Sequence, residues 1–236
     1  MERMAANYTK QIVCLANSRK PGGRCIAGRE ILKSGVGGWI RPVSARPTAE
    51  VSLEERRYEN GVDPRILDTL TVPMIGQVPK MHQTENHMLD AQYYWTKTGE
   101  MKWGDLKDLT ETPQTLWGTG NSTYYGINDA VSAEDAAKLT SSLYLIKPSK
   151  LAVQVQTEGG MFGPAKRRVR ADLMYAGTNY RFMVTDPIAE EVFLGRGEGA
   201  FAIDQAYLCV SLTEPYSGDG RCHKLVATII TKKPLE

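Results

Sequence analysis

Short apolar runs separated by glycine and proline fill the first 45 residues of the chain. The runs KQIVCLAN, RCIAGREIL and WIRPVS alternate with the turn segments RKPGG and SGVGG. Because no helical stripe of apolar positions is sustained, this pattern favours β-strands. Residues 46–65 form a polar connection that predicts one short helix, and ILDTLTVPMIGQV at 66–78 predicts another strand. Pro73 and Pro79 predict that this strand lies at a sheet edge or ends early.

The segment 80–130 is polar and irregular, yet it holds three of the four tryptophans, Trp95, Trp103 and Trp117. Large aromatic side chains in a segment poor in aliphatic residues usually pin loops onto a core. SAEDAAKL at 132–139 then predicts a short helix with Ser132 as its N-cap. The segment is therefore expected to consist of packed loops that end in this helix.

The last hundred residues give the clearest pattern. Strands are predicted at 151–158, 167–177 and 179–185, a helix at 187–194, and strands at 206–214 and 222–231. In the sequence VTDP, Asp186 is expected to cap that helix and Pro187 to occupy its first turn, with a ligand contact for Thr185 or Asp186 as the alternative. Three strands, a helix and two strands is the order of an OB-fold, although sandwiches and other small barrels share much of it.

Two distant segments of the chain resemble each other. IVCLANSRKPGGRCIAGREIL at 12–32 and YLCVSLTEPYSGDGRCHKLVATII at 207–230 each place a cysteine-containing strand before a polar turn and a Gly-Arg-Cys sequence. Internal similarity is the mark of duplication. We therefore predict a mainly β protein with minor α structure, built as a tandem of two OB-like small β-barrels. An N-terminal barrel with a long irregular insertion would span 1–138, and a C-terminal barrel would span 139–236. The first barrel would have to be permuted or completed by other segments.

The charge of the chain is unevenly distributed. Residues 1–48 carry nine Lys or Arg against two acidic residues, a balance of +7, whereas the net charge of the whole chain is +2. A basic N-terminal face suits a partner that bears phosphate, although a solvated surface without a partner explains the charge equally well.

Several function classes lose their usual support. The four cysteines form no CxxC and only three histidines are present, so buried free thiols are expected, with no metal and no cofactor. The chain also lacks the phosphate-loop, dinucleotide-binding, HExxH and GxSxG motifs. Neither a long apolar run nor an export signal is evident. We expect a cytoplasmic protein without membrane contact.

Two groups of candidate ligand-binding residues lie in the basic N-terminal region. Asn17, Ser18, Arg19, Lys20 and Arg24 surround a Gly-Pro turn, where amides and guanidinium groups can hold phosphate, or they form an ordinary polar hairpin. Trp39 and Arg41 share one face of a predicted strand, where they would stack a base and pair a phosphate. The alternative places Trp39 in the core and pairs Arg41 with a carboxylate.

Two further groups lie later in the chain. HQTEN offers His82, Glu85 and Asn86, enough donors and acceptors to read a base edge or to transfer a proton, or else a loop bonded to its own backbone. Arg168 and Arg170 alternate along the basic run GPAKRRVR, either lining a phosphate-tracking groove or protecting an edge strand with charge.

The sequence as a whole resembles a known family. IVCLANSRKPGGRC followed by GWIRPVS, HQTEN at 82–86, SLYLIKP at 142–148 and YRFMVTDP at 180–187 are similar to the dual OB-containing domain of bacterial proteins associated with defence and conflict systems. The resemblance covers nearly the whole chain. It implies two OB-like barrels and a nucleic-acid or nucleotide ligand, and it carries no catalytic residues over.

Three functions remain open from the sequence. The leading interpretation is a module of a bacterial or phage conflict system that binds nucleic acid or a phosphorylated nucleotide through a basic, aromatic-containing groove. The second is a nuclease or cyclic-nucleotide phosphodiesterase with His82 or Glu85 as general base. The third is a protein-interaction module that contacts a protein partner through exposed β edges and aromatics.

Overall fold

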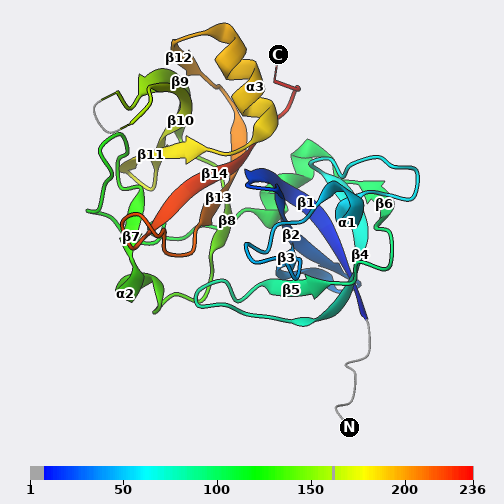
Figure 1. The fold of residues 1–236 in the computed structure, drawn as a ribbon. Helices are drawn as coiled ribbons and strands as arrows, with labels where there is room; N and C mark the ends of the chain where they lie inside the picture. The colour runs from blue at the N-terminus through cyan, green and yellow to red at the C-terminus, as the bar shows by residue number, and fades with distance from the viewer. Residues whose placement is uncertain (1–7, 161–162, 236) are drawn as a thin grey trace. The chain divides into compact units, whose positions relative to one another are not determined.

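The protein folds into two compact units, both built mainly from β-strands (Figure 1). The structure is a computed structural model of the 236-residue chain and describes residues 8–160 and 163–235. The first unit ends at Leu109, and the second begins at Thr110. The mainly β class predicted from the sequence is confirmed.

The strands of the first unit pair in a closed ring. Its elements are β1 (Tyr8–Lys20), β2 (Gly23–Leu32), β3 (Gly35–Val43), α1 (Leu53–Arg56), β4 (Asp68–Gln77), β5 (Asn86–Leu89), β6 (Thr96–Glu100) and a 3-10 helix (Trp103–Leu109). β1 pairs with β2, β2 with β3, β3 with β5, β5 with β4, and β4 with β1. Only the β3–β5 pairing in this ring is parallel, and β6 adds to β4.

The second unit contains a longer and open sheet. Its elements are β7 (Ala130–Ser132), α2 (Ala133–Ala136), β8 (Leu143–Ile146), β9 (Lys150–Glu158), β10 (Lys166–Tyr175), β11 (Thr178–Val184), α3 (Pro187–Arg196), β12 (Gly199–Ala202), β13 (Ala206–Leu212) and β14 (Arg221–Thr231). The strand order is β12-β9-β10-β11-β14-β13-β8, and β7 pairs with β14. β11 and β14 are parallel neighbours.

Both units share one connectivity. With β6, β7, β8 and β12 set aside, each unit has three antiparallel strands, a helix and two more strands, and its third strand (β3 or β11) lies parallel to its fifth (β5 or β14). This is the Greek-key arrangement of the OB-fold, with β1 of the first unit equivalent to β9 of the second. β8 and β12 are additions to the second sheet. The predicted two-domain OB-like arrangement is confirmed.

The internal sequence similarity does not follow this equivalence. Its first copy lies on β1 and β2, the opening hairpin of the first unit, whereas its second copy lies on β13 and β14, the closing hairpin of the second. Of the two expectations for the first barrel, permutation or completion by other segments, the structure matches the second, because β3, β4 and β5 complete the ring that β1 and β2 begin. The shared Gly-Arg-Cys segments lie at the start of β2 in the first unit and of β14 in the second, and these two strands hold different positions in their sheets.

The units divide earlier in the chain than the boundary expected after residue 138. Residues 110–138 belong to the second unit, where the backbone amide of Leu116 donates to the Tyr180 hydroxyl at 3.3 Å. Ser132 of β7 also lies opposite Arg221 of β14. The polar segment 110–138 packs onto the core of the second unit through isolated large side chains. Such contacts produce no periodic pattern in the sequence, so the boundary could not be predicted from it.

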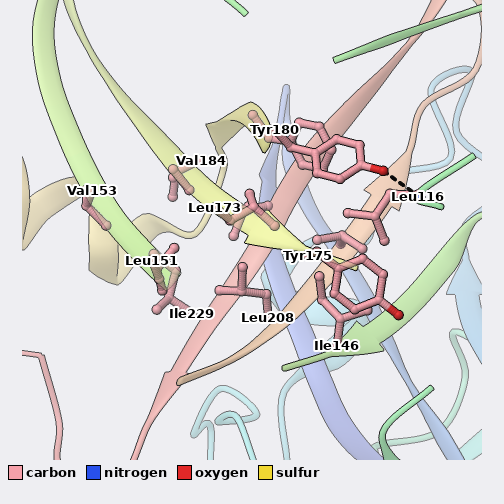
Figure 2. Close-up of a cluster of buried hydrophobic side chains, with 14 of the residues drawn as sticks. Leu116, Ile146, Leu151, Val153, Leu173, Tyr175, Tyr180, Val184, Leu208 and Ile229 are labelled. Atoms are coloured by element: carbon pink, nitrogen blue, oxygen red, sulfur yellow. Dashed lines mark hydrogen bonds between the residues drawn. The ribbon is translucent and has the colours of Figure 1, made fainter. Parts of the chain in front are cut away.

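Each unit has its own apolar core, filled by alternate residues of its strands. In β9, Leu151, Val153 and Val155 point inward, and Figure 2 shows Leu151 and Val153 beside Leu173, Leu208 and Ile229. The core of the first unit gathers Ile12, Cys14, Ile26, Ile40, Val51, Tyr58, Leu70, Val72, Met74, Leu89 and Trp95.

Two local predictions, for Asp186 and for the prolines of β4, can be compared with the structure. Asp186 caps α3, accepting hydrogen bonds from the amides of Ile188 and Ala189 at 3.0 and 3.2 Å, and Pro187 begins the helix; both features are as predicted. By contrast, Pro73 does not mark a sheet edge, because β4 pairs with β1, β5 and β6. β4 nevertheless ends before Pro79, at Gln77.

Candidate nucleic-acid interface

The tip of the β1–β2 hairpin concentrates positive charge. Arg19 lies directly opposite Arg24 across the pair, and Lys20 lies opposite Gly23. Arg19 is exposed, whereas Lys20 and Arg24 are partly exposed. Gly22 closes the turn with φ +80°, a left-handed conformation that glycine adopts without strain. The turn therefore holds two guanidinium groups at adjacent cross-strand positions.

A carboxylate lies beside this turn. A Cβ atom added to Gly22 would come within 3.2 Å of an oxygen of Glu50. A hydrogen bond from Thr48 and, to a lesser degree, the charges of Arg46 and Lys20 lower the pKa of Glu50. Glu50 is therefore ionised at neutral pH and offsets part of the positive charge at the hairpin.

Asn17 and Ser18 make structural contacts just below the tip. The Asn17 amide donates to the carbonyl of Pro64 at 2.9 Å and so ties β1 to the segment before β4. Ser18 is buried, and its hydroxyl lies 3.5 Å from the carbonyl oxygen of Cys25. These two side chains support the hairpin from within.

The outer face of β2 and β3 carries a cation over an aromatic ring. Arg29 lies opposite Trp39, and its guanidinium carbon is 5.8 Å from the centroid of the Trp39 ring. Arg29 also donates from Nε and Nη2 to the carbonyl of Gly37, at 3.0 and 2.8 Å. Because strand residues alternate between faces, Lys20 lies on the same face as Arg29 and Trp39. Arg19 and Arg24 lie on the other side of the hairpin.

Arg41 is held in the interior of the first unit. Its side chain is 5% exposed, and its Nη2 lies 3.0 Å from an Oε1 of Glu85, which is equally buried. Arg41 also lies beside Asn86 in the parallel β3–β5 pair. This arrangement matches the structural alternative given for Arg41, a guanidinium paired with a carboxylate, and it joins β3 to the start of β5.

The candidate residues of the HQTEN segment are also buried, whereas Thr84 is exposed. His82 is 0% exposed and Asn86 is 4% exposed. The Asn86 amide donates to the side chain of Gln83 at 3.3 Å. In this conformation neither His82 nor Glu85 has the access to solvent and substrate that a general base requires.

The two arginines proposed on β10 differ in environment. Arg168 is partly exposed, whereas Arg170 is buried and donates from Nε and Nη2 to the two carboxylate oxygens of Glu158, at 2.5 and 2.9 Å. Its Nη1 lies 3.8 Å from Asp129, and its guanidinium carbon lies 5.9 Å from the ring centroid of Tyr125. Arg170 is thus committed to an internal network of the second unit.

The structure places only some of the candidates on the exposed parts of the hairpin and its neighbouring strand. We give the name hairpin surface to Arg19, Lys20, Arg24, Arg29 and Trp39, all on β1, β2 and β3; Lys20, Arg29 and Trp39 lie on its outer face, and Arg19 and Arg24 on the opposite face. Arg29 was missed by the sequence analysis, because only the register of β2 against β3 brings it beside Trp39. Arg41, His82, Glu85, Asn86 and Arg170 are internal, and Arg168 belongs to the other unit.

Two negative findings apply to residues 8–160 and 163–235. No group of three or more His, Cys, Asp or Glu side chains there is arranged to hold a metal ion. Among the helices of the same residues, none combines the length and apolar character needed to cross a membrane.

Comparisons with known proteins assign the chain to a family. No curated protein matches it in sequence. Among solved structures, the crystal structure of the tetrameric p202 HIN2 aligns with 98% of this chain and 100% of that one, at 9% identity and a TM-score of 0.31, a similarity too low to support an inference. The model of the dual OB-containing domain, by contrast, matches residues 10–229. The chain therefore belongs to the dual OB-containing domain family.

Proposed function

We propose that this protein binds nucleic acid through the hairpin surface of its first unit. The observation that carries the proposal is the position of Arg19 directly opposite Arg24. Like charges that face each other across an antiparallel pair repel. A phosphate group between the two guanidinium groups would lower this repulsion and accept charge-assisted hydrogen bonds from both.

The neighbouring aromatic side chain supplies the second part of the interaction. Trp39 is partly exposed and lies beside Arg29 on the outer face of β2 and β3. OB-folds bind oligonucleotides on strands two and three and on the loop between strands one and two. In the first unit these elements are β2, β3 and the Pro21–Gly22 turn. Trp39 would stack a base on the outer face, where Lys20 and Arg29 also lie, and Arg19 and Arg24 would hold a phosphate on the other face of the hairpin.

We also propose that binding serves as a sensor step in a bacterial or phage conflict system. The similarity of the sequence to proteins associated with such systems supports this role. The ligand class we favour is a single strand, because stacking on Trp39 requires a base that is not already stacked between neighbours.

Fluorescence anisotropy with labelled single-stranded DNA, single-stranded RNA and duplex, measured at several salt concentrations, tests the proposal. We expect Trp39→Ala to weaken single-strand binding by about 1–3 kcal/mol, and Trp39→Phe to restore most of it. Arg24→Ala should lower the slope of log K against log salt by about 0.7, the value for one phosphate contact on a single strand.

Lys107→Ala is the matched control, because Lys107 is exposed on the 3-10 helix and is not part of the hairpin surface. Binding by this variant should equal that of the wild type. If none of the three polymers binds at low salt, or if the Arg24 and Trp39 variants bind as well as the wild type, the proposal fails.

A further inference from the structure

The first unit contains a second concave site, separate from the hairpin surface. It has a volume of about 780 Å³, within the usual range for small-molecule pockets. Its lining comes from the segment that follows α1, the start of β4, and residues 94–97 at the start of β6. A backbone bridge between Tyr58 and Trp95 joins two of these walls. None of the lining residues belongs to β1, β2 or β3.

The acidic group at the base of the pocket is already satisfied. Asp68 is 2% exposed, and it accepts hydrogen bonds from the Tyr58 hydroxyl at 2.7 Å and the Arg65 amide at 2.9 Å, besides its ion pair with Lys97. Burial opposes ionisation of Asp68, but these donors, Lys97 foremost, hold its pKa below the ordinary value. Asp68 therefore fixes the wall and has no need of a cation from a ligand.

An exposed aromatic ring forms another part of the lining. Tyr94 is 48% exposed, and the guanidinium carbon of Arg57 lies 5.8 Å from the centroid of its ring. The buried rings of Tyr58 and Trp95 line the same pocket. A planar aromatic ligand can stack on Tyr94, as bases stack on exposed aromatic side chains.

One residue of the lining carries a hydrogen-bond donor that lacks a protein acceptor. Within the described residues, Trp95 Nε1 is buried and has no hydrogen-bond partner. The same is true of Nε of Arg57, which contacts Tyr94 but does not itself line the pocket. Buried polar groups without partners are uncommon and call for an explanation. The lining also holds two exposed charged side chains of opposite sign, Arg65 and Glu59. A ligand that pairs with Trp95 and Arg65 therefore offers acceptors and negative charge.

We propose that this pocket binds a small aromatic anion, of the class of a free mononucleotide. The base stacks on Tyr94, and the phosphate pairs with Arg65. This site is independent of polymer binding on the hairpin surface, since the two share no residue. A mononucleotide also fits the size of the pocket, which exceeds what inorganic phosphate alone can fill.

Isothermal titration of the full chain with AMP, GMP, CMP and UMP tests the site, with adenosine and inorganic phosphate as partial ligands. We expect at least one mononucleotide to bind with a Kd between about 10 µM and 1 mM. Tyr94→Ala should weaken that binding at least about tenfold, and Tyr94→Phe should restore it. Arg65→Ala should weaken mononucleotide binding by about tenfold and leave adenosine binding unchanged.

Tyr93→Ala is the matched control, because Tyr93 is 57% exposed, adjacent in sequence and outside the lining; it should bind as the wild type does. The absence of saturable binding for all four mononucleotides would overturn the proposal. Inorganic phosphate that binds as tightly as the mononucleotide would overturn the aromatic part of the assignment. Mononucleotide binding that is lost in Trp39→Ala but kept in Tyr94→Ala would assign the ligand to the hairpin surface instead.

Discussion

Lys224 shows how far a single residue can depart from its ordinary chemistry in this fold. Its side chain is 1% exposed, and Nζ donates to the carbonyl of Gly118 at 2.7 Å. Nζ also lies 5.6 Å from the ring centroid of Tyr180. Burial lowers the pKa of Lys224 to about 8, although Asp129, which also interacts with Arg170, acts in the opposite direction.

This pKa predicts a pH dependence of stability. The folded pKa lies below the ordinary value of 10.5, so between these values the unfolded chain binds more protons and stability rises with pH. We expect Lys224 to contribute about 2 kcal/mol to the gain in unfolding free energy between pH 7.5 and 9.5. Chemical denaturation of the wild type and Lys224→Met at both pH values measures this contribution.

The comparison with the variant removes the effect of other groups. Burial raises the pKa of Cys222 to about 11, which lowers stability as the pH rises above the ordinary thiol pKa. That contribution is present in both proteins and cancels in their difference. Equal changes with pH in the wild type and Lys224→Met would contradict the prediction.

At the scale of elements, Asp186 joins α3 to β14. One carboxylate oxygen caps the helix, and the other accepts from the Ile229 amide at 3.0 Å. Asp186→Ala should lower the unfolding free energy by about 2–4 kcal/mol, because it removes the cap and leaves a buried amide unpaired. Asp186→Asn should lose less, since its amide oxygen can still cap α3. Denaturant titration measures both, with the exposed Asp204→Ala expected to differ little from the wild type.

The buried ion pair between Arg41 and Glu85 connects β3 to the start of β5. Glu85→Gln removes the negative charge that lies 3.0 Å from the buried guanidinium of Arg41 and should cost about 3–5 kcal/mol of stability. Glu100→Gln is the control, because its ion pair with Lys97 is exposed and should be worth under about 1 kcal/mol. If urea titrations gave Glu85→Gln and Glu100→Gln the same free energy of unfolding, the buried ion pair would not stabilise the connection between β3 and β5.

The elements themselves were largely accessible from the sequence, because alternation and turn residues are local signals. Strands such as β9 and β10 lie close to their predicted ranges. The pairing register of strands that are far apart in the sequence is not a local signal. It determined which candidate residues lie at the surface and which are buried. Trp39 and Arg41 are two residues apart on β3, yet Trp39 lies partly exposed beside Arg29, whereas Arg41 is buried and paired with Glu85. The alternation of residues along a strand shows which of them share a face, but it does not show which distant strand lies beside them.

At the scale of the whole molecule, the strand order of the two units matches the OB architecture after which the family is described. The order of three strands, a helix and two strands predicted β9, β10, β11, α3, β13 and β14 of the second unit, but not β12. In the first unit the same order was obscured because α1 has only four residues and residues 78–85 separate β4 from β5. The assignment of 110–138 to the second unit also depended on contacts of single residues, Leu116 among them. Residues that join a core through isolated contacts cannot be recognised from the composition of the segment or from the spacing of its apolar positions.

The open sheet of the second unit has a consequence for solubility. β12 and β8 end its strand order, and each has only four residues. An outermost strand offers unpaired backbone groups that can recruit a strand from another molecule, and short outermost strands limit this recruitment. The first unit avoids the problem for β1 to β5 by closing them into a ring. Both units therefore restrict the sites at which a β-rich chain can begin to aggregate.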